Sequence, residues 1–159
     1  MVEGGGSEIA VVEGVVDRPV IASAPIGTDE MIVVVSPTHA WAGLPGEAIR
    51  PSDSAWVLRE PGSGTRVAFE TLASGPDFDR AVVETALVLP SNEAVLAAVE
   101  AGAGATLVSR SAASAALRGG LLTEVDWPAV PRPFHLLRHK ERYRSKAAAA
   151  FEALVRQNA

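Results

Sequence analysis

The stretch Leu58-Arg59-Glu60-Pro61-Gly62-Ser63-Gly64-Thr65-Arg66 decides how this sequence folds. The residues that lead into it, 55–59, form a short apolar run that is typical of a β-strand. Proline and glycine at 61–64 predict a tight turn. Apolar residues at helical spacing then predict a helix over 65–74, which Gly75-Pro76 end. The stretch therefore predicts a strand, a glycine-rich turn and a helix.

Such a turn is a candidate anion site. The first amide groups of a helix have no partners within the helix, and together with the helix dipole they favour a carboxylate, sulfate or phosphate. Ser63 and Thr65 would add hydroxyl donors, and Gly64 lets a ligand approach the backbone closely. The local pattern leaves open the alternative that Ser63 only caps the helix.

A second strand-to-helix junction follows at Leu89-Pro90-Ser91-Asn92. The N-terminus of its helix, predicted over 91–101, would face the first across a crevice, since ligands of α/β sheets lie beyond the carboxyl ends of the strands. Plain capping by Ser91 is the alternative. Further segments read as strands or helices. Strands are predicted over 8–14, 31–36, 82–89, 105–109, 121–125 and 133–138, with a shorter extended segment over 18–25, and the first of these strands is expected to be buried. Helices are predicted over 111–117 and after Ser145. Ser145 is expected to cap the last helix, whose apolar face comprises Ala147, Ala148, Phe151, Leu154 and Val155. This alternation predicts an α/β fold with a largely parallel sheet.

The composition excludes several classes of protein. The 159 residues include no cysteine, which excludes a disulfide scaffold and a thiolate metal site. Acidic residues outnumber basic ones 19 to 14, for a net charge of −5, which disfavours non-specific DNA binding. The basic run 138–146 leaves open a nucleic-acid contact, but the run is short and no helix-turn-helix candidate accompanies it, so it is interpreted as a solvated loop. No apolar run approaches the roughly 20 residues that span a bilayer, and no secretory signal is seen, so we expect a cytoplasmic protein.

The known catalytic motifs do not fit. The turn lacks the lysine of a P-loop, and its order differs from the G-x-S-x-G of a nucleophile elbow. The three histidines, His39, His135 and His139, have no metal-ligand spacing. We therefore expect no metal and no cofactor. Composition does not exclude a Ser-His-Asp site, but no pattern locates one.

Residues 59–66 resemble the R-E-x-G-S-G-T-R stretch in the effector-binding domain of LysR-type transcriptional regulators. Other segments resemble the same family. Residues 8–14 are similar to its D-I-A-I-x-x-G strand, 29–39 to its D-E-L-V-L-V-x-P-x-H-P segment, 91–110 to its helix and glycine-rich strand, and 132–138 with 151–154 to its ending. The order and spacing agree from about Glu3 to the C-terminus.

The resemblance implies a fold like type 2 periplasmic binding proteins, with two α/β lobes and a ligand cleft. It implies a partial first lobe over 1–49, a second lobe over 50–126, and a return to the first lobe with a C-terminal helix over 127–159. The family's helix-turn-helix head and the first strand and helix of its first lobe are absent. The first lobe is thus expected to be incomplete, with an exposed edge on the first strand.

The resemblance also implies a function. We expect the sensing domain of a regulator, which binds a small-molecule effector, a carboxylate or other anion, and has no enzymatic activity. It is expected to form a homo-oligomer, a dimer, with no direct DNA contact from this segment and no membrane. The expected ligand contacts are Arg59, Ser63, Gly64 and Thr65, with Ser91 and Asn92 on the second junction and Glu13 and Gly14 at the cleft edge of the first lobe. For Arg59 two roles stay open, pairing with an acidic ligand or bracing the turn.

Three alternatives remain. The chain would serve as a lobe of a solute-binding protein if it had an export signal. It would serve as a stand-alone partner if it dimerised with full-length relatives. An acid-binding transferase or hydrolase using Ser63 is the least favoured, because no histidine lies near Ser63 in the sequence.

Overall fold

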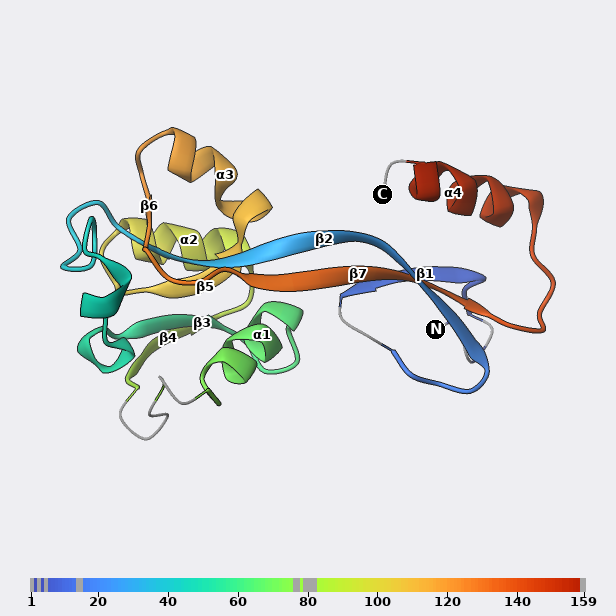
Figure 1. Ribbon diagram of the computed structural model, residues 1–159, viewed down its shortest axis with the longest axis horizontal. Helices are drawn as coiled ribbons and strands as arrows, with labels where there is room; N and C mark the ends of the chain where they lie inside the picture. Colours follow the sequence, from blue (N-terminus) through green and yellow to red (C-terminus); the bar gives the residue numbers. More distant parts are fainter. Residues whose placement is uncertain are drawn as a thin grey trace. The chain divides into compact units, whose positions relative to one another are not determined.

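The computed structural model describes residues 2, 4, 6–13, 16–75, 78 and 83–157. The strands and helices follow one another as Figure 1 shows. The strands are β1 (Ile9–Glu13), β2 (Ile21–Val35), β3 (Trp56–Arg59), β4 (Thr85–Leu89), β5 (Thr106–Ser109), β6 (Thr123–Glu124) and β7 (Val130–His139). The helices are α1 (Gly64–Leu72), α2 (Asn92–Glu100), α3 (Arg110–Arg118) and α4 (Lys146–Gln157), with 3-10 turns η1 (Gly46–Ala48) and η2 (Pro51–Asp53). The α/β class is confirmed. The helix stop at Pro76 and the strand start at Val82 lie outside the described residues.

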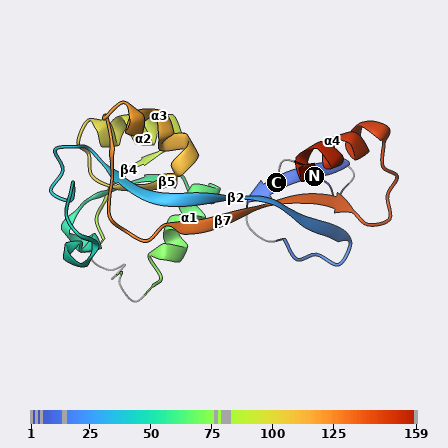
Figure 2. The same ribbon diagram turned by 45° about the horizontal axis from the view of Figure 1, so that its top comes forward.

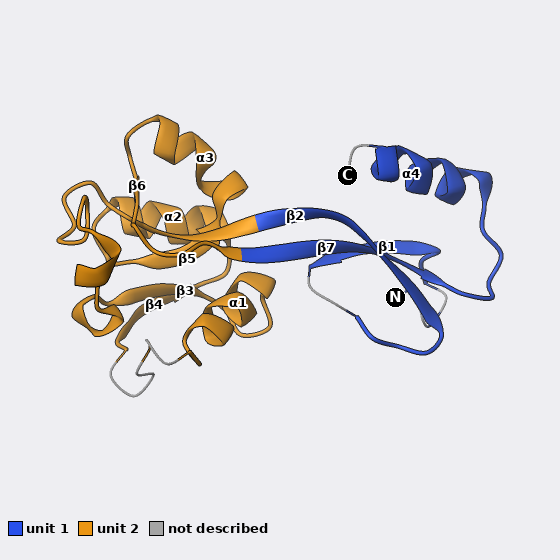
Figure 3. Cartoon of the chain, in the orientation of Figure 1, with its two compact units in different colours: residues 1–29, 131–159 blue, residues 30–130 orange. Residues whose placement is uncertain are grey.

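The chain forms two compact units (Figure 3). Unit 1 comprises residues 1–29 and 131–159, and unit 2 comprises residues 30–130. Both β2 and β7 therefore contribute residues to each unit. The lobes implied by the resemblance divide the chain after residues 49 and 126, and that division stays a prediction.

Unit 2 is built in three layers. In β2, Met31 and Val33 enter one core with Phe69 of α1, whereas Ile32 and Val34 enter a second core with residues of α2 and α3. The continuous apolar run of β2 is thus buried on both faces, as strands covered by helices on both sides require. Figures 1 and 2 show α1 on one side of these strands and α2 and α3 on the other.

Strand β3 lies at the centre of the parallel part of the fold. It pairs in parallel with β4, and Trp56 forms a parallel bridge with Ala105 just before β5. The close approach of the two backbone segments at this bridge requires glycine at position 104. Gly104 has φ +134°, and a Cβ atom there would collide with the carbonyl oxygen of Ala55. Gly104 therefore allows β5 to align with β3.

The larger sheet is antiparallel, and the expectation of a largely parallel sheet is wrong there. Its order is β1-β7-β2-β5, with β6 also paired to β2. Strand β1 pairs with β7, and β2 pairs with β5 and β6, all antiparallel. A parallel neighbour requires a crossover of a dozen or more residues, usually a helix. Only the region from β3 to β6 alternates strands with helices, while strands follow strands on either side of it.

Two segments that were predicted separately form a single strand, β2. Residues 18–25 and 31–36 were expected to be separate, but β2 runs without a break over 15 residues. Pro25, Gly27 and the polar residues 28–30 look like turn signals. In the strand, the central residues alternate between half-buried and exposed positions, which polar side chains tolerate.

Unit 1 differs from the expectations in its burial. Strand β1 ends the strand order, as the expected edge does, but it is half-exposed rather than buried, and Val11 is 48% exposed. Ser145 caps α4 as predicted, since its hydroxyl accepts from the backbone N–H of Ala148 at 3.1 Å. The predicted apolar face of α4 is not its buried face. Of Ala147, Ala148, Phe151, Leu154 and Val155, only Ala148 is buried.

Glu152 takes the buried position on α4 instead. It is 7% exposed and accepts hydrogen bonds from Arg144 at 2.8 Å and from Arg156 at 3.0 Å. Burial raises the pKa of the Glu152 carboxyl, but the two arginines outweigh burial and hold the pKa below its ordinary value. A paired glutamate can thus replace apolar residues on a buried face. No helix in the described part of the chain is long and apolar enough to cross a membrane.

Substitution of two valines on neighbouring strands tests whether β3 is buried between the two cores of unit 2. Val57 of β3 is 0% exposed, whereas Val88 of β4 is 50% exposed. We expect Val57→Ala to lower the free energy of unfolding by about 2 kcal/mol, because it removes buried methyl groups and leaves a cavity. Val88→Ala is expected to change it by less than about 0.5 kcal/mol. Urea denaturation of both variants measures the difference, and equal losses would contradict this arrangement.

Candidate functional site

Parallel pairing brings the two predicted junctions to the same edge of β3 and β4. Arg59, the last residue of β3, lies opposite Leu89, the last residue of β4. Helix α1 begins five residues after Arg59, and α2 begins three residues after Leu89. Both helices therefore start beyond the carboxyl ends of neighbouring parallel strands, where ligands of α/β sheets bind.

The Arg59 side chain ties the two junctions together. Its Nη1 donates to Asn92 Oδ1 at 2.7 Å, while Nε and Nη2 donate to the two carboxylate oxygens of Glu60 at 2.8 and 3.0 Å. These hydrogen bonds from Arg59 hold the pKa of the Glu60 carboxyl below its ordinary value. The sequence left open whether Arg59 meets an acidic ligand or braces the turn, and in this structure it braces the turn.

The start of α1 has unused hydrogen-bond donors. Ser63 occupies the N-cap position, yet its side chain makes no capping hydrogen bond. Gly62, at φ +91°, turns the chain into the helix in a conformation that favours glycine. The first helical hydrogen bond runs from the N–H of Val67 to Ser63 O at 3.0 Å. The backbone N–H groups of Gly64 and Thr65 consequently have no partner among the described residues.

Two hydroxyl groups accompany these amides. Neither the Ser63 nor the Thr65 hydroxyl has a hydrogen-bond partner in the part of the chain that the structure describes. Thr65 is 7% exposed. An anion bound here would therefore lose part of its water shell and accept hydrogen bonds from these amides and hydroxyls instead. The alternative that Ser63 serves only as a side-chain cap does not describe this turn.

At the start of α2, protein groups already satisfy the free amides and balance the positive end of the helix dipole. The Ser91 hydroxyl accepts from the N–H of Ala94 at 3.1 Å, which is plain capping. Hydrogen bonds from its own backbone N–H and from Ser91 hold the pKa of the Glu93 carboxyl below its ordinary value, so a negative charge lies at this helix end. Asn92 uses its carbonyl oxygen to accept from Arg59. An added anion is therefore favoured at α1 rather than at α2, and ligand contact by Ser91 and Asn92 stays a prediction.

The remaining predicted contacts belong to unit 1. Glu13 of β1 accepts from Arg132 Nη1 at 2.7 Å, and Arg132 Nη2 donates to Asp29 Oδ2 at 2.8 Å. The Arg132 guanidinium also lies 5.7 Å from the ring centroid of Phe134. Arg132 thus links three neighbouring strands, a role that the sequence analysis missed. Its proximity to two acidic residues on other strands appears only once the strand pairing is known. Gly14 lies outside the described residues.

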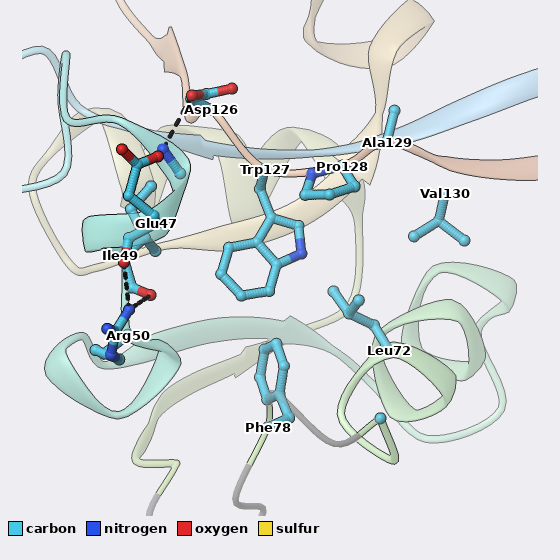
Figure 4. Close-up of a pocket in the computed structure, with 12 residues that line it drawn as sticks. Glu47, Ile49, Arg50, Leu72, Phe78, Asp126, Trp127, Pro128, Ala129 and Val130 are labelled. Carbon is cyan, nitrogen blue, oxygen red and sulfur yellow. Dashed lines mark hydrogen bonds between the residues drawn. The ribbon is translucent and has the colours of Figure 1, made fainter.

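Unit 2 also contains a cavity of about 940 Å³ that none of the predicted ligand contacts lines (Figure 4). Trp127 and Phe78 contribute its aromatic walls. Its charged side chains are engaged or acidic. Arg50 Nη1 donates to Glu47 O at 2.7 Å and to Ile49 O at 2.9 Å, and Asp126 Oδ2 accepts from the Gly46 N–H at 2.9 Å. The two carboxylates, Glu47 and Asp126, make this cavity a poor site for an anion.

Catalytic and metal chemistry find little support in the site. No histidine or carboxylate hydrogen-bonds Ser63 within the described residues, and the His39 ring is engaged by Ser54 Oγ at 3.1 Å. In the same residues, no three side chains of histidine, aspartate or glutamate gather as a metal site would require. The arrangement at α1 is suited to binding an anion.

A family model described as LysR substrate binding domain matches residues 1–159. This chain belongs to the LysR substrate-binding domain family. The chain is 32% identical over 148 residues, 91% of its length, to the uncharacterized HTH-type transcriptional regulator YeiE of Escherichia coli strain K12, of which that match covers 49%. It is 35% identical over 136 residues, 81% of its length, to the uncharacterized HTH-type transcriptional regulator Rv2282c of Mycobacterium tuberculosis, of which 42% is covered. It thus spans about half the length of the curated relatives it matches.

Solved LysR regulatory domains share the fold. The regulatory domain of Synechocystis PCC6803 CcmR, in complex with 2-PG, superposes with a TM-score of 0.83 at 22% identity, covering 98% of this chain and 75% of that one. The effector binding domain of QuiR, in complex with shikimate, gives 0.79 at 18% identity, covering 98% and 73%. These likenesses confirm the predicted fold class, and LysR effector-binding domains are not enzymes.

Substitution of the N-cap serines of α1 and α2 distinguishes a hydroxyl that caps its helix, Ser91, from one that does not, Ser63. We expect Ser91→Ala to lower the free energy of unfolding by about 1 kcal/mol, because it removes the cap on Ala94 N–H. Ser63→Ala is expected to change it by less than about 0.5 kcal/mol, because the Ser63 side chain caps nothing. Thermal and urea unfolding measure both variants. A loss at Ser63 as large as that at Ser91 would show that Ser63 is a structural cap.

Proposed function

We propose that this chain is the effector-sensing part of a LysR-type transcriptional regulator and that it binds a small anion at the start of α1. One observation carries the proposal. The N–H groups of Gly64 and Thr65 and the hydroxyls of Ser63 and Thr65 are grouped at one helix N-terminus, and none of them is used by the described fold. Family membership supports the sensing role.

A carboxylate is the class of ligand that fits this donor set. Several N–H and O–H donors at the positive end of a helix favour a group with two or more acceptor oxygens. Arg59 is already paired with Glu60, so it acts by holding the two junctions in place. The relatives of known structure support a small-molecule effector, since CcmR is described with 2-PG and QuiR with shikimate.

Several wider properties belong to the same proposal. We infer a cytoplasmic homodimer. In each chain the first lobe comprises residues 1–49 and 127–159, and the second lobe comprises residues 50–126. The effector would change how the lobes of this dimer are arranged. Direct DNA contact would be made by other parts of the regulator, which agrees with the net charge of −5 on this chain.

The proposal is tested by ligand binding to variants of Thr65. Small carboxylates, beginning with shikimate, are screened by thermal shift, and those that bind are titrated by calorimetry. We expect Thr65→Ala to weaken binding about tenfold, because it removes a hydrogen bond to a charged group from a buried site. Thr65→Ser keeps the hydroxyl and is expected to retain most of the affinity.

Thr71→Ala is the matched control on the same helix. The Thr71 hydroxyl donates to Val67 O at 2.9 Å in the last turn of α1, away from the helix start. Its substitution should leave the affinity unchanged. Equal losses in Thr65→Ala and Thr71→Ala, or no loss in Thr65→Ala, would contradict the assignment of the site to this turn.

A further inference from the structure

A second concave site lies in unit 1, where the start of β1 meets the end of β7. The antiparallel register places Ile9 opposite Arg138, which brings Glu8 beside the last residues of β7. Together with the loop that follows β7, these residues enclose a cavity of about 290 Å³. Its lining includes Arg138, His139, Arg142 and Arg144, with the ring of Tyr143 and one carboxylate, Glu8.

The loop after β7, which carries Arg142 and Arg144, is anchored at several points. The backbone N–H of Lys140 donates to Val20 O at 3.0 Å, and Lys140 Nζ donates to Pro19 O at 2.7 Å. At the other end of the loop, the N–H and hydroxyl of Ser145 donate to Glu8 Oε2 at 3.1 and 2.7 Å. These contacts fix both ends of the loop that lines the cavity.

The positive charges of this cavity exceed the negative ones. Glu8 is committed to Ser145, whose hydrogen bonds hold the pKa of that carboxyl below its ordinary value. Arg144 is paired with Glu152 at 2.8 Å. Arg142 makes one long hydrogen bond, from Nη1 to Val2 O at 3.4 Å, and the Arg138 side chain has no hydrogen bond or ion pair with any described residue. Two guanidinium groups thus retain donors that face a concavity.

We propose that this cavity binds the phosphate group of a small phosphorylated molecule. Guanidinium groups match the geometry and charge of phosphate oxygens, and two of them together favour a doubly charged anion over a single carboxylate. A nucleic acid strand carries the same group. The small volume and the net charge of −5 on the whole chain favour the small molecule. This site goes beyond the proposed function, which concerns α1 in unit 2.

The single tyrosine of the chain gives a direct readout. Tyr143 lines the cavity, so the intact chain labelled with 3-fluorotyrosine has one ¹⁹F signal that reports on this site. We expect titration with inorganic pyrophosphate to move that signal along a saturable curve. Arg138→Gln and Arg142→Gln are each expected to weaken binding about tenfold, since each removes hydrogen bonds to a charged group. Added NaCl should weaken binding further.

Two controls separate this site from other causes. Arg118→Gln removes an arginine at the end of α3, outside the cavity, and should leave the titration unchanged. Thr65→Ala removes the proposed effector contact on α1, and it too should leave the Tyr143 signal unchanged, so the two proposals fail independently. Circular dichroism confirms that each variant is folded.

Three results would overturn the proposal. The first is the absence of a saturable shift with pyrophosphate. The second is a loss of binding in Arg118→Gln as large as in Arg138→Gln, which would show a general charge effect. The third is a shift with a short DNA duplex but none with pyrophosphate, which would make the surface a nucleic-acid contact instead.

Discussion

The parallel pairing of β3 with β4 is the constraint on which the candidate site depends. It places Arg59 opposite Leu89 and so brings the starts of α1 and α2 to one edge. Packing on both faces holds this pairing, since Trp56 and Leu58 belong to one core and Val57 to the other. The hydrogen bond from Arg59 to Asn92 then fixes the two junctions to each other. Stability and site geometry therefore depend on the same short strand.

The two helix starts differ in how their charge is balanced. At α2, the Ser91 cap and the Glu93 carboxylate satisfy the positive end of the helix. At α1, the N-cap serine leaves its side chain unused, and the following amides have no partner within the described residues. A helix start without internal compensation is favourable for an anion from solution. This asymmetry explains why one junction is suited to a ligand while its neighbour is suited to a structural role.

Features set by neighbouring residues could be predicted from the sequence, whereas features set by long-range pairing could not. The glycine-rich turn and the caps at Ser91 and Ser145 follow from neighbouring residues, and all three are present. The single long β2 was not predictable from local signals, because only pairing with other strands overrides Pro25 and the polar residues that follow it. The buried Glu152 was missed because its arginine partners are recognisable only in three dimensions. The unused Ser63 side chain was likewise invisible, since sequence shows that a residue can cap a helix and not that it does.

The most direct test of the account is an amide-shift titration of the ¹⁵N-labelled chain with small carboxylates, beginning with shikimate. The account predicts that the N–H signals of Gly64 and Thr65 move together and saturate with one dissociation constant. Saturable shifts confined to the cavity lined by Phe78 and Trp127, with the start of α1 unchanged, would contradict it.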